Sequence, residues 1–82
     1  MYTVGLINKY EVLRTYTYSS LEEARKELES WEKIFRLNNN VKYSTTITER
    51  DASEQIAKVK IIFEVENSRY IMFMCSTVNC CK

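Results

Sequence analysis

The chain has 82 residues and a formal net charge of +1, and it contains no histidine, no proline and a single glycine. This length suits one domain with one hydrophobic core. The missing histidine excludes hydrolytic triads, and a single glycine excludes glycine-rich phosphate-binding loops. We therefore expect a single domain over residues 1–82 that is not an enzyme, needs no cofactor or metal, and has a frayed tail at 79–82.

The charges are spread evenly along the chain, with six basic and six acidic groups in residues 1–37 and six basic and five acidic groups in residues 38–82. A duplex-binding protein concentrates Lys and Arg on one face, and a DNA mimic needs a strong acidic excess. Neither imbalance is present. The longest apolar run, Tyr70 to Cys75, is far shorter than the ~20 residues of a membrane span. With no signal-peptide pattern at the N-terminus, we expect a cytoplasmic protein.

The cysteines Cys75, Cys80 and Cys81 all lie near the C-terminus. Their number is odd, and a structural zinc site requires four ligands, so neither a disulfide framework nor a zinc site is expected. We interpret Cys75 as a small apolar strand residue and Cys80 and Cys81 as reduced thiols. The alternative is a dimer that pools cysteines in an intermolecular disulfide or metal site.

The N-terminal third has the pattern of a β-hairpin, with strands over residues 2–7 and 10–18 and a tight connection at Asn8 and Lys9. Val4, Leu6 and Leu13 are expected on the face that packs against a helix. Gly5 lies inside the first strand, which indicates either a bulge or the close approach of another group.

Residues 21–37 have the pattern of an amphipathic helix. Ser20 and Glu23 form a capping box at its start, and three asparagines, residues 38–40, are expected to end it. The apolar stripe expected to face the core consists of Leu21, Ala24, Leu28, Trp31 and Phe35, widened by Ile34.

Three strands are predicted after the helix. Residues 41–48 alternate apolar and polar side chains, as in a half-buried strand. Residues 50–54 form a polar loop, and strands over 55–66 and 69–78 pair across a turn at Asn67 and Ser68. The order ββαβββ predicts an α+β fold, with one helix on one face of a mostly antiparallel sheet.

The last hairpin has a second apolar face. We expect Glu64 opposite Ile71, Ile62 opposite Phe73 and Lys60 opposite Cys75, on the side away from the helix. One helix covers only one side of a sheet, so this face has no predicted cover. Apolar residues inside a charged rim are typical of an interface. The candidate partner-binding residues are Ile62, Ile71 and Phe73, with Ile56 at the strand start, and the rim residues Lys58, Lys60, Glu64 and Arg69.

We therefore predict a small protein-interaction module that binds another protein, or a second copy of itself, through this face. Its size and lack of chemistry are typical of phage and mobile-element proteins that inhibit a host protein, such as a defence or CRISPR-type protein, by occlusion. A nucleic-acid-binding domain that uses the same face is the first alternative. A homodimer whose pairing only completes the fold is the second. A coiled sheet or a folded-back tail that hides the apolar residues would remove the interface altogether.

Overall fold

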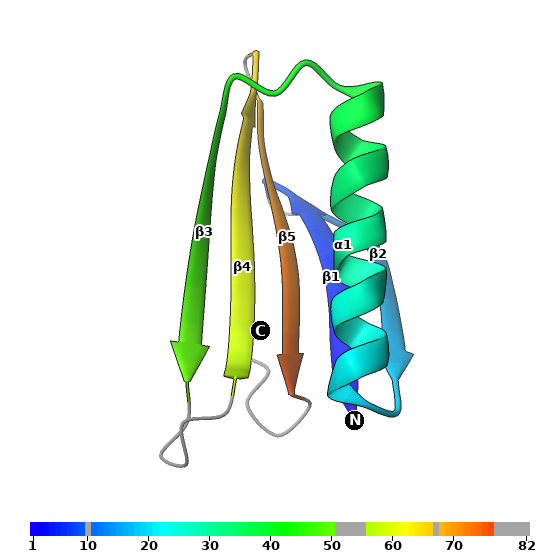
Figure 1. Ribbon diagram of the computed structural model, residues 1–82. Coiled ribbons are helices and arrows are strands. Elements are labelled where there is room, and N and C mark those ends of the chain that lie inside the picture. Colours follow the sequence, from blue (N-terminus) through cyan, green and yellow to red (C-terminus); the bar gives the residue numbers. More distant parts are fainter. Residues whose placement is uncertain (10, 51–55, 67, 77–82) are drawn as a thin grey trace.

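The computed structural model describes residues 1–9, 11–50, 56–66 and 68–76, with the side chains of residues 56 and 57 left out. The described chain forms one antiparallel sheet of five strands and one helix, which confirms the predicted α+β fold (Figure 1). The strand order across the sheet is β2-β1-β5-β4-β3. In chain order the elements are β1 (Tyr2–Asn8), β2 (Glu11–Tyr18), α1 (Leu21–Asn38), β3 (Tyr43–Arg50), β4 (Ile56–Val65) and β5 (Ser68–Ser76).

Helix α1 connects β2 and β3, which lie at opposite edges of the sheet. It packs over β1, β2 and β5 on one face and leaves β3 to one side (Figure 1). We call the sheet face opposite α1 the outer face. Because α1 is the only helix among the described residues, no described helix covers the outer face.

The core lies between α1 and the three central strands. Phe35 of α1 packs on the rings of Phe63 and Tyr70, with centroid distances of 4.6 Å and 5.2 Å. The predicted apolar stripe of the helix is confirmed, except that Ile34 is 55% exposed. It lies beyond the edge of the stripe and not within it. The buried core cluster consists of Val4, Ala24, Leu28, Trp31, Phe35, Ile61, Phe63, Met72 and Met74.

Both ends of α1 are closed by side chains. The Ser20 hydroxyl accepts a hydrogen bond from the Glu23 backbone N–H at 3.1 Å, as the capping box predicts. At the other end, the Asn39 amide Nδ2 donates to the Phe35 carbonyl at 3.0 Å. The backbone of Asn39 is extended, with φ of −137°. Asparagine therefore ends the helix by capping a carbonyl with its side chain and not by adopting a left-handed conformation.

The first hairpin differs from its expected arrangement at Leu13. The register places Leu6 opposite Arg14 and Ile7 opposite Val12, so Leu13 is the extra residue of a β-bulge. Arg14 takes the position expected for Leu13 on the helix side, and Leu13 is 45% exposed. The expectation that Leu13 shares the helix-side face with Val4 and Leu6 is wrong, because one inserted residue reverses the alternation of faces after it.

The second hairpin is shifted by two residues from the expected register. Glu64 pairs with Arg69, Ile62 with Ile71 and Lys60 with Phe73. The turn begins one residue earlier than predicted, because Glu66 adopts a left-handed conformation with φ of 50°. A shift of two residues preserves the side of the sheet on which each side chain lies, so the predicted faces are confirmed although the predicted pairs are not.

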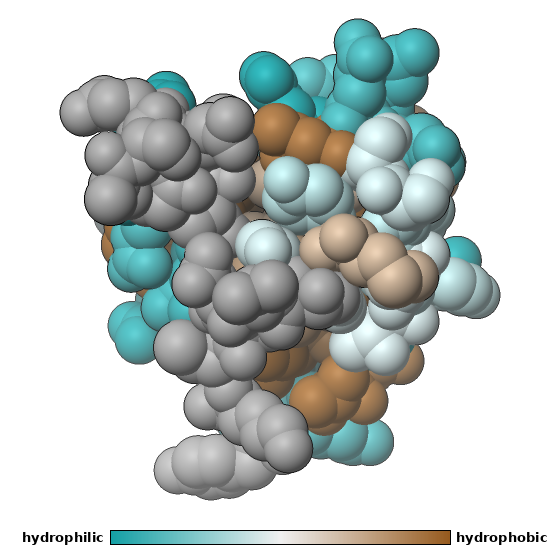
Figure 2. Space-filling model, turned by 90° about the horizontal axis from the view of Figure 1, so that it is seen from below, coloured by the Kyte–Doolittle hydropathy of each residue, from teal (hydrophilic) through white to brown (hydrophobic). Residues whose placement is uncertain are grey.

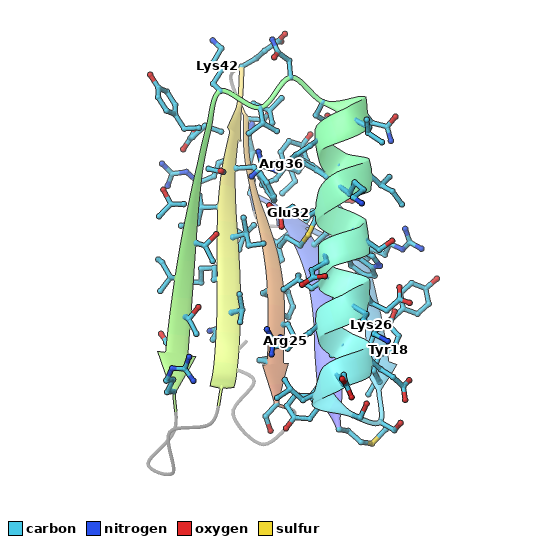
Figure 3. The ribbon with its side chains drawn as sticks, viewed as in Figure 1. Tyr18, Arg25, Lys26, Glu32, Arg36 and Lys42 are labelled. Atoms are coloured by element: carbon cyan, nitrogen blue, oxygen red, sulfur yellow. The ribbon has the colours of Figure 1, made fainter. Side chains whose placement is uncertain are left out.

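Strand β3 is exposed along its whole length, and the expectation of a half-buried strand is wrong. The side chains on its helix side are those of Ser44, Thr46 and Thr48. Their hydroxyl groups can hydrogen-bond to water, so the strand is stable without burial against α1. Arg36 bridges α1 and β3: its Nη2 donates to the Ser44 hydroxyl at 2.9 Å and pairs with Glu32 at 3.1 Å. Figure 3 shows Glu32 and Arg36 directed from α1 toward the sheet.

Cys75 is 1% exposed and takes part in a disulfide bond, so it is not the free apolar thiol expected from the sequence. Cys80 and Cys81, predicted to be reduced, lie outside the described residues, as do the loop at 51–54, the tail at 79–82 and the side chain of Ile56.

Candidate protein-interaction surface

The structure brings the predicted site residues together on the outer face. The register of β4 with β5 places their side chains on the side opposite the buried Ile61, Phe63 and Met72. Their apolar members, Ile62, Ile71 and Phe73, are half-buried by their neighbours on the sheet and are not fully exposed. The predicted site residues that the structure places on this face are Ile62, Ile71, Phe73, Lys58, Lys60, Glu64 and Arg69.

An apolar row crosses the sheet at the centre of this face. Ile62 of β4 pairs with Ile71 of β5, Ile71 with Ile7 of β1, and Ile7 with Val12 of β2. Thr45 of β3 pairs with Ile62 and extends the row to the other edge. Side chains in directly paired positions lie side by side, so these residues form one continuous apolar strip. We call Val12, Ile7, Ile71 and Ile62 the apolar row.

Sequence reasoning missed Ile7 and Val12 because the sheet order was unknown. The chain alone predicts that β4 pairs with β5, but nothing local indicates that β1 lies on the other side of β5. The alternation of side chains along β1 places Ile7 on the face opposite Val4 and Leu6. Only the topology shows that this residue continues the row.

A second row beside the first contains Ile47, Lys60, Phe73 and Gly5. A Cβ atom built on Gly5 would lie 2.4 Å from Cζ of Phe73. The Phe73 ring therefore lies directly across the Gly5 backbone, which confirms the close approach predicted for this glycine. Gly5 allows the ring to lie flat against the sheet, and part of the ring surface is buried there.

The rim of the outer face carries charges of both signs. Arg69 Nε donates to Glu64 Oε1 at 2.7 Å, and this pair lies at one end of the face. At the other end, Glu49 is the register partner of Lys58. Lys60 remains between Ile47 and Phe73 in the second row. The outer face is thus apolar at its centre and carries charges of both signs at its rim.

The β3 side of the outer face is the most exposed. Tyr43 is 73% exposed and Ile47 is 43% exposed, and both point to the outer face because their partners are Glu64 and Lys60. Sequence reasoning assigned these two residues to a half-buried strand. Their exposure extends the apolar surface to an open sheet edge, where unpaired backbone groups are also available to a partner.

Figure 2 shows the molecule from below. Where described residues are visible in that view, the apolar ones form separate patches between hydrophilic ones. The described residues also contain no group of three or more His, Cys, Asp or Glu side chains that could hold a metal ion. The outer face is therefore the surface that best fits a binding role.

No helix in the described part of the chain is both long and apolar enough to cross a membrane. No protein-family model, curated protein or solved structure matches the chain. Its function is therefore inferred from its own surface.

Proposed function

We propose that this protein is a non-enzymatic interaction module that docks another protein on its outer face. The observation that supports this proposal is the apolar row, which continues through neighbouring strands from Val12 to Ile62. A contiguous apolar surface surrounded by polar groups is typical of a protein-binding site, because burying it against a partner removes it from water.

The charge of the outer face favours a protein over a nucleic acid. Nucleic-acid affinity depends on several Lys and Arg side chains that neutralise phosphates. On this face Arg69 is bound to Glu64, and Glu49 is the register partner of Lys58, so acidic side chains stand beside two of the cations and lower the positive potential that a phosphate backbone would meet. Tyr43 and Phe73 offer aromatic rings for base stacking, but Glu64 is the direct neighbour of Tyr43 and would repel a phosphate backbone.

The proposed mode of action is occlusion. A module without catalytic groups changes the activity of its partner by covering a surface that the partner needs. The small size of the chain fits an inhibitor of a host protein, of the kind that phages and mobile elements carry. We propose that it acts in the cytoplasm. Cytosolic thiols would reduce the Cys75 disulfide, so binding should be measured with and without reductant.

Selective loss of capture tests the proposal. An affinity-tagged chain is compared with Ile62→Lys, which introduces a charge into the apolar row, and with Ile47→Lys at its exposed margin. Leu37→Lys is the matched control, because Leu37 is an 80% exposed apolar residue of α1. An untagged copy of the chain is included, so that self-association is detected as well. Each variant is first checked for its helix and strand signal by circular dichroism.

We expect the wild type and Leu37→Lys to capture one defined protein, or the untagged copy of the chain. Both outer-face variants should fail to capture it. Retention in 0.5 M salt is expected for a protein partner, whereas binding to a nucleic acid falls steeply with salt. Phe73→Asp should act in the same direction, but Phe73 packs on Gly5 and its loss also tests stability. Equal capture by the wild type, Ile62→Lys, Ile47→Lys and Leu37→Lys contradicts the proposal.

A further inference from the structure

A hollow of about 160 Å³ lies on the opposite side of the sheet from the outer face, between the C-terminal half of α1 and strands β1, β2 and β5. Apolar cavities of about 150 Å³ accept a benzene-sized group. The hollow therefore has room for one apolar group of the size of a protein side chain. Its lining residues are Leu6, Arg14, Trp31, Ile34, Phe35, Asn38, Asn39 and Met72.

Arg14 is held in the wall of this hollow by two aromatic rings. Its guanidinium carbon lies 4.9 Å from the centroid of the Trp31 ring and 5.1 Å from that of Tyr16. The two rings meet nearly at right angles, at 81° and 5.9 Å between centroids. Because the rings are nearly perpendicular, the planar guanidinium can lie flat on at most one of them, and its five N–H donors exceed what two ring contacts can occupy.

In the part of the chain that the structure describes, Arg14 forms no ion pair with a carboxylate. The charge of the Glu27 carboxylate raises the pKa of the neighbouring Tyr18, but among the described residues Glu27 forms no ion pair with Arg14. Arg14 thus supplies planar donors that match the two oxygens of a carboxylate. These donors stand beside apolar walls formed by Trp31 and Phe35.

We propose that the hollow binds an apolar group of side-chain size that carries a carboxylate next to it, with the carboxylate paired to Arg14. A hydrophobic residue at the C-terminus of a polypeptide and a small branched-chain acid share this chemistry. The site is separate from the outer face, so the proposal stands or falls independently of the proposed function.

Trp31 makes the hollow directly observable, because it is the single tryptophan of the chain and lines the site. The protein is titrated with N-acetyl-L-leucine and, separately, with N-acetyl-L-leucinamide while tryptophan fluorescence is recorded. The two probes differ only in the terminal group, which is a charged carboxylate in the acid and a neutral amide in the other. We expect a saturable change with the acid and an affinity at least about 10-fold lower for the amide, as for loss of a charged hydrogen-bonded pair.

Two pairs of variants assign the response to the hollow. Arg14→Gln should weaken binding of the acid by at least about 10-fold, whereas Arg25→Gln, near the N-terminal end of α1 in Figure 3, should leave it unchanged. Ile34→Glu places a competing carboxylate in the lining and should weaken binding, whereas Leu37→Glu, outside the lining, should not.

A comparison of two further probes distinguishes the sources of the ligand. Tighter binding of the peptide Ala-Ala-Leu than of 4-methylpentanoate indicates a polypeptide C-terminus, and the reverse order indicates a small acid. The proposal is overturned if N-acetyl-L-leucine and its amide bind equally well. It is also overturned if neither probe changes the emission of Trp31, or if Arg14→Gln binds the acid as tightly as the wild type.

Discussion

At the scale of single residues, Tyr18 shows how the α1–β2 contact affects ionisation. Burial raises the pKa of the Tyr18 hydroxyl above 10.0, and the nearby Glu27 carboxylate raises it further. The neutral form is therefore favoured in the folded protein. The stability linked to this group is fully present below about pH 10 and is lost as the pH rises through the folded-state pKa.

This linkage predicts a difference between the wild type and Tyr18→Phe in alkaline solution. Between about pH 9 and pH 11, the free energy of unfolding should fall more for the wild type than for Tyr18→Phe, because phenylalanine has no proton to lose. Urea denaturation at several pH values measures the difference. Tyr43→Phe, in the exposed strand β3, is the matched control. Parallel pH profiles for the wild type and Tyr18→Phe would contradict this account of Tyr18.

Gly5 and Phe73 form a second single-residue test. A methyl group at Gly5 would overlap the Phe73 ring, so Gly5→Ala should lower the free energy of unfolding by about 1–3 kcal/mol. Replacing the ring removes the overlap, and the loss should therefore be smaller when Gly5→Ala is made in a Phe73→Leu background. A double-mutant cycle in urea gives the coupling directly. Additive effects would show that the ring does not constrain Gly5.

At the scale of elements, the start of α1 depends on one hydrogen bond. Ser20→Ala removes the acceptor for the Glu23 backbone N–H and should destabilise the protein by about 1 kcal/mol. Ser19→Ala is the matched control, because the Ser19 hydroxyl contacts only the exposed Glu23 carboxylate at 3.1 Å and its loss should have little effect. Thermal unfolding followed by circular dichroism compares the two. Equal losses would assign the effect to the loop before α1 and not to the cap.

The elements also show how far sequence patterns predict this structure. Local chemistry determined α1: the Ser20 cap, the apolar stripe and the terminal asparagines lie close together in the chain, and all were recognised. The two hairpins were recognised too, but Leu13 was misplaced because a bulge leaves no signal in the alternation of apolar and polar residues. The register of the β4–β5 hairpin was missed because glutamate rarely adopts the left-handed conformation that Glu66 has in the turn.

Long-range arrangement was harder to predict than local structure. The exposure of β3 follows from its place at the edge of the sheet, beyond α1, and its sequence alternates like that of a covered strand. The candidate site was predicted where it depends on one hairpin, at Ile62, Ile71 and Phe73. Its extension to Ile7 and Val12 depends on the pairing of β1 with β5, between segments far apart in the chain.

At the scale of the whole molecule, the two sides of the sheet differ in character. One side is covered by α1 and contains the core, and a small hollow opens in it beside Arg14. The outer face carries the apolar row, whose residues Ile7, Ile71 and Ile62 are half-buried, and no described helix covers it. Cys75 lies on the same face, as the register partner of Lys58, and is 1% exposed, so the part of this face that can meet a partner is the apolar row and its β3 side.

Side-chain methyl groups provide the most direct test of the outer face as the docking surface. Ile7, Ile62 and Ile71 report on the apolar row, and Leu37 reports on the exposed side of α1. Their NMR signals are followed while the captured partner is added or, if the partner is a second copy, while the protein is diluted. We predict that the three outer-face signals shift together and that the Leu37 signal does not. A shift of Leu37 with the outer-face signals unchanged would contradict the account.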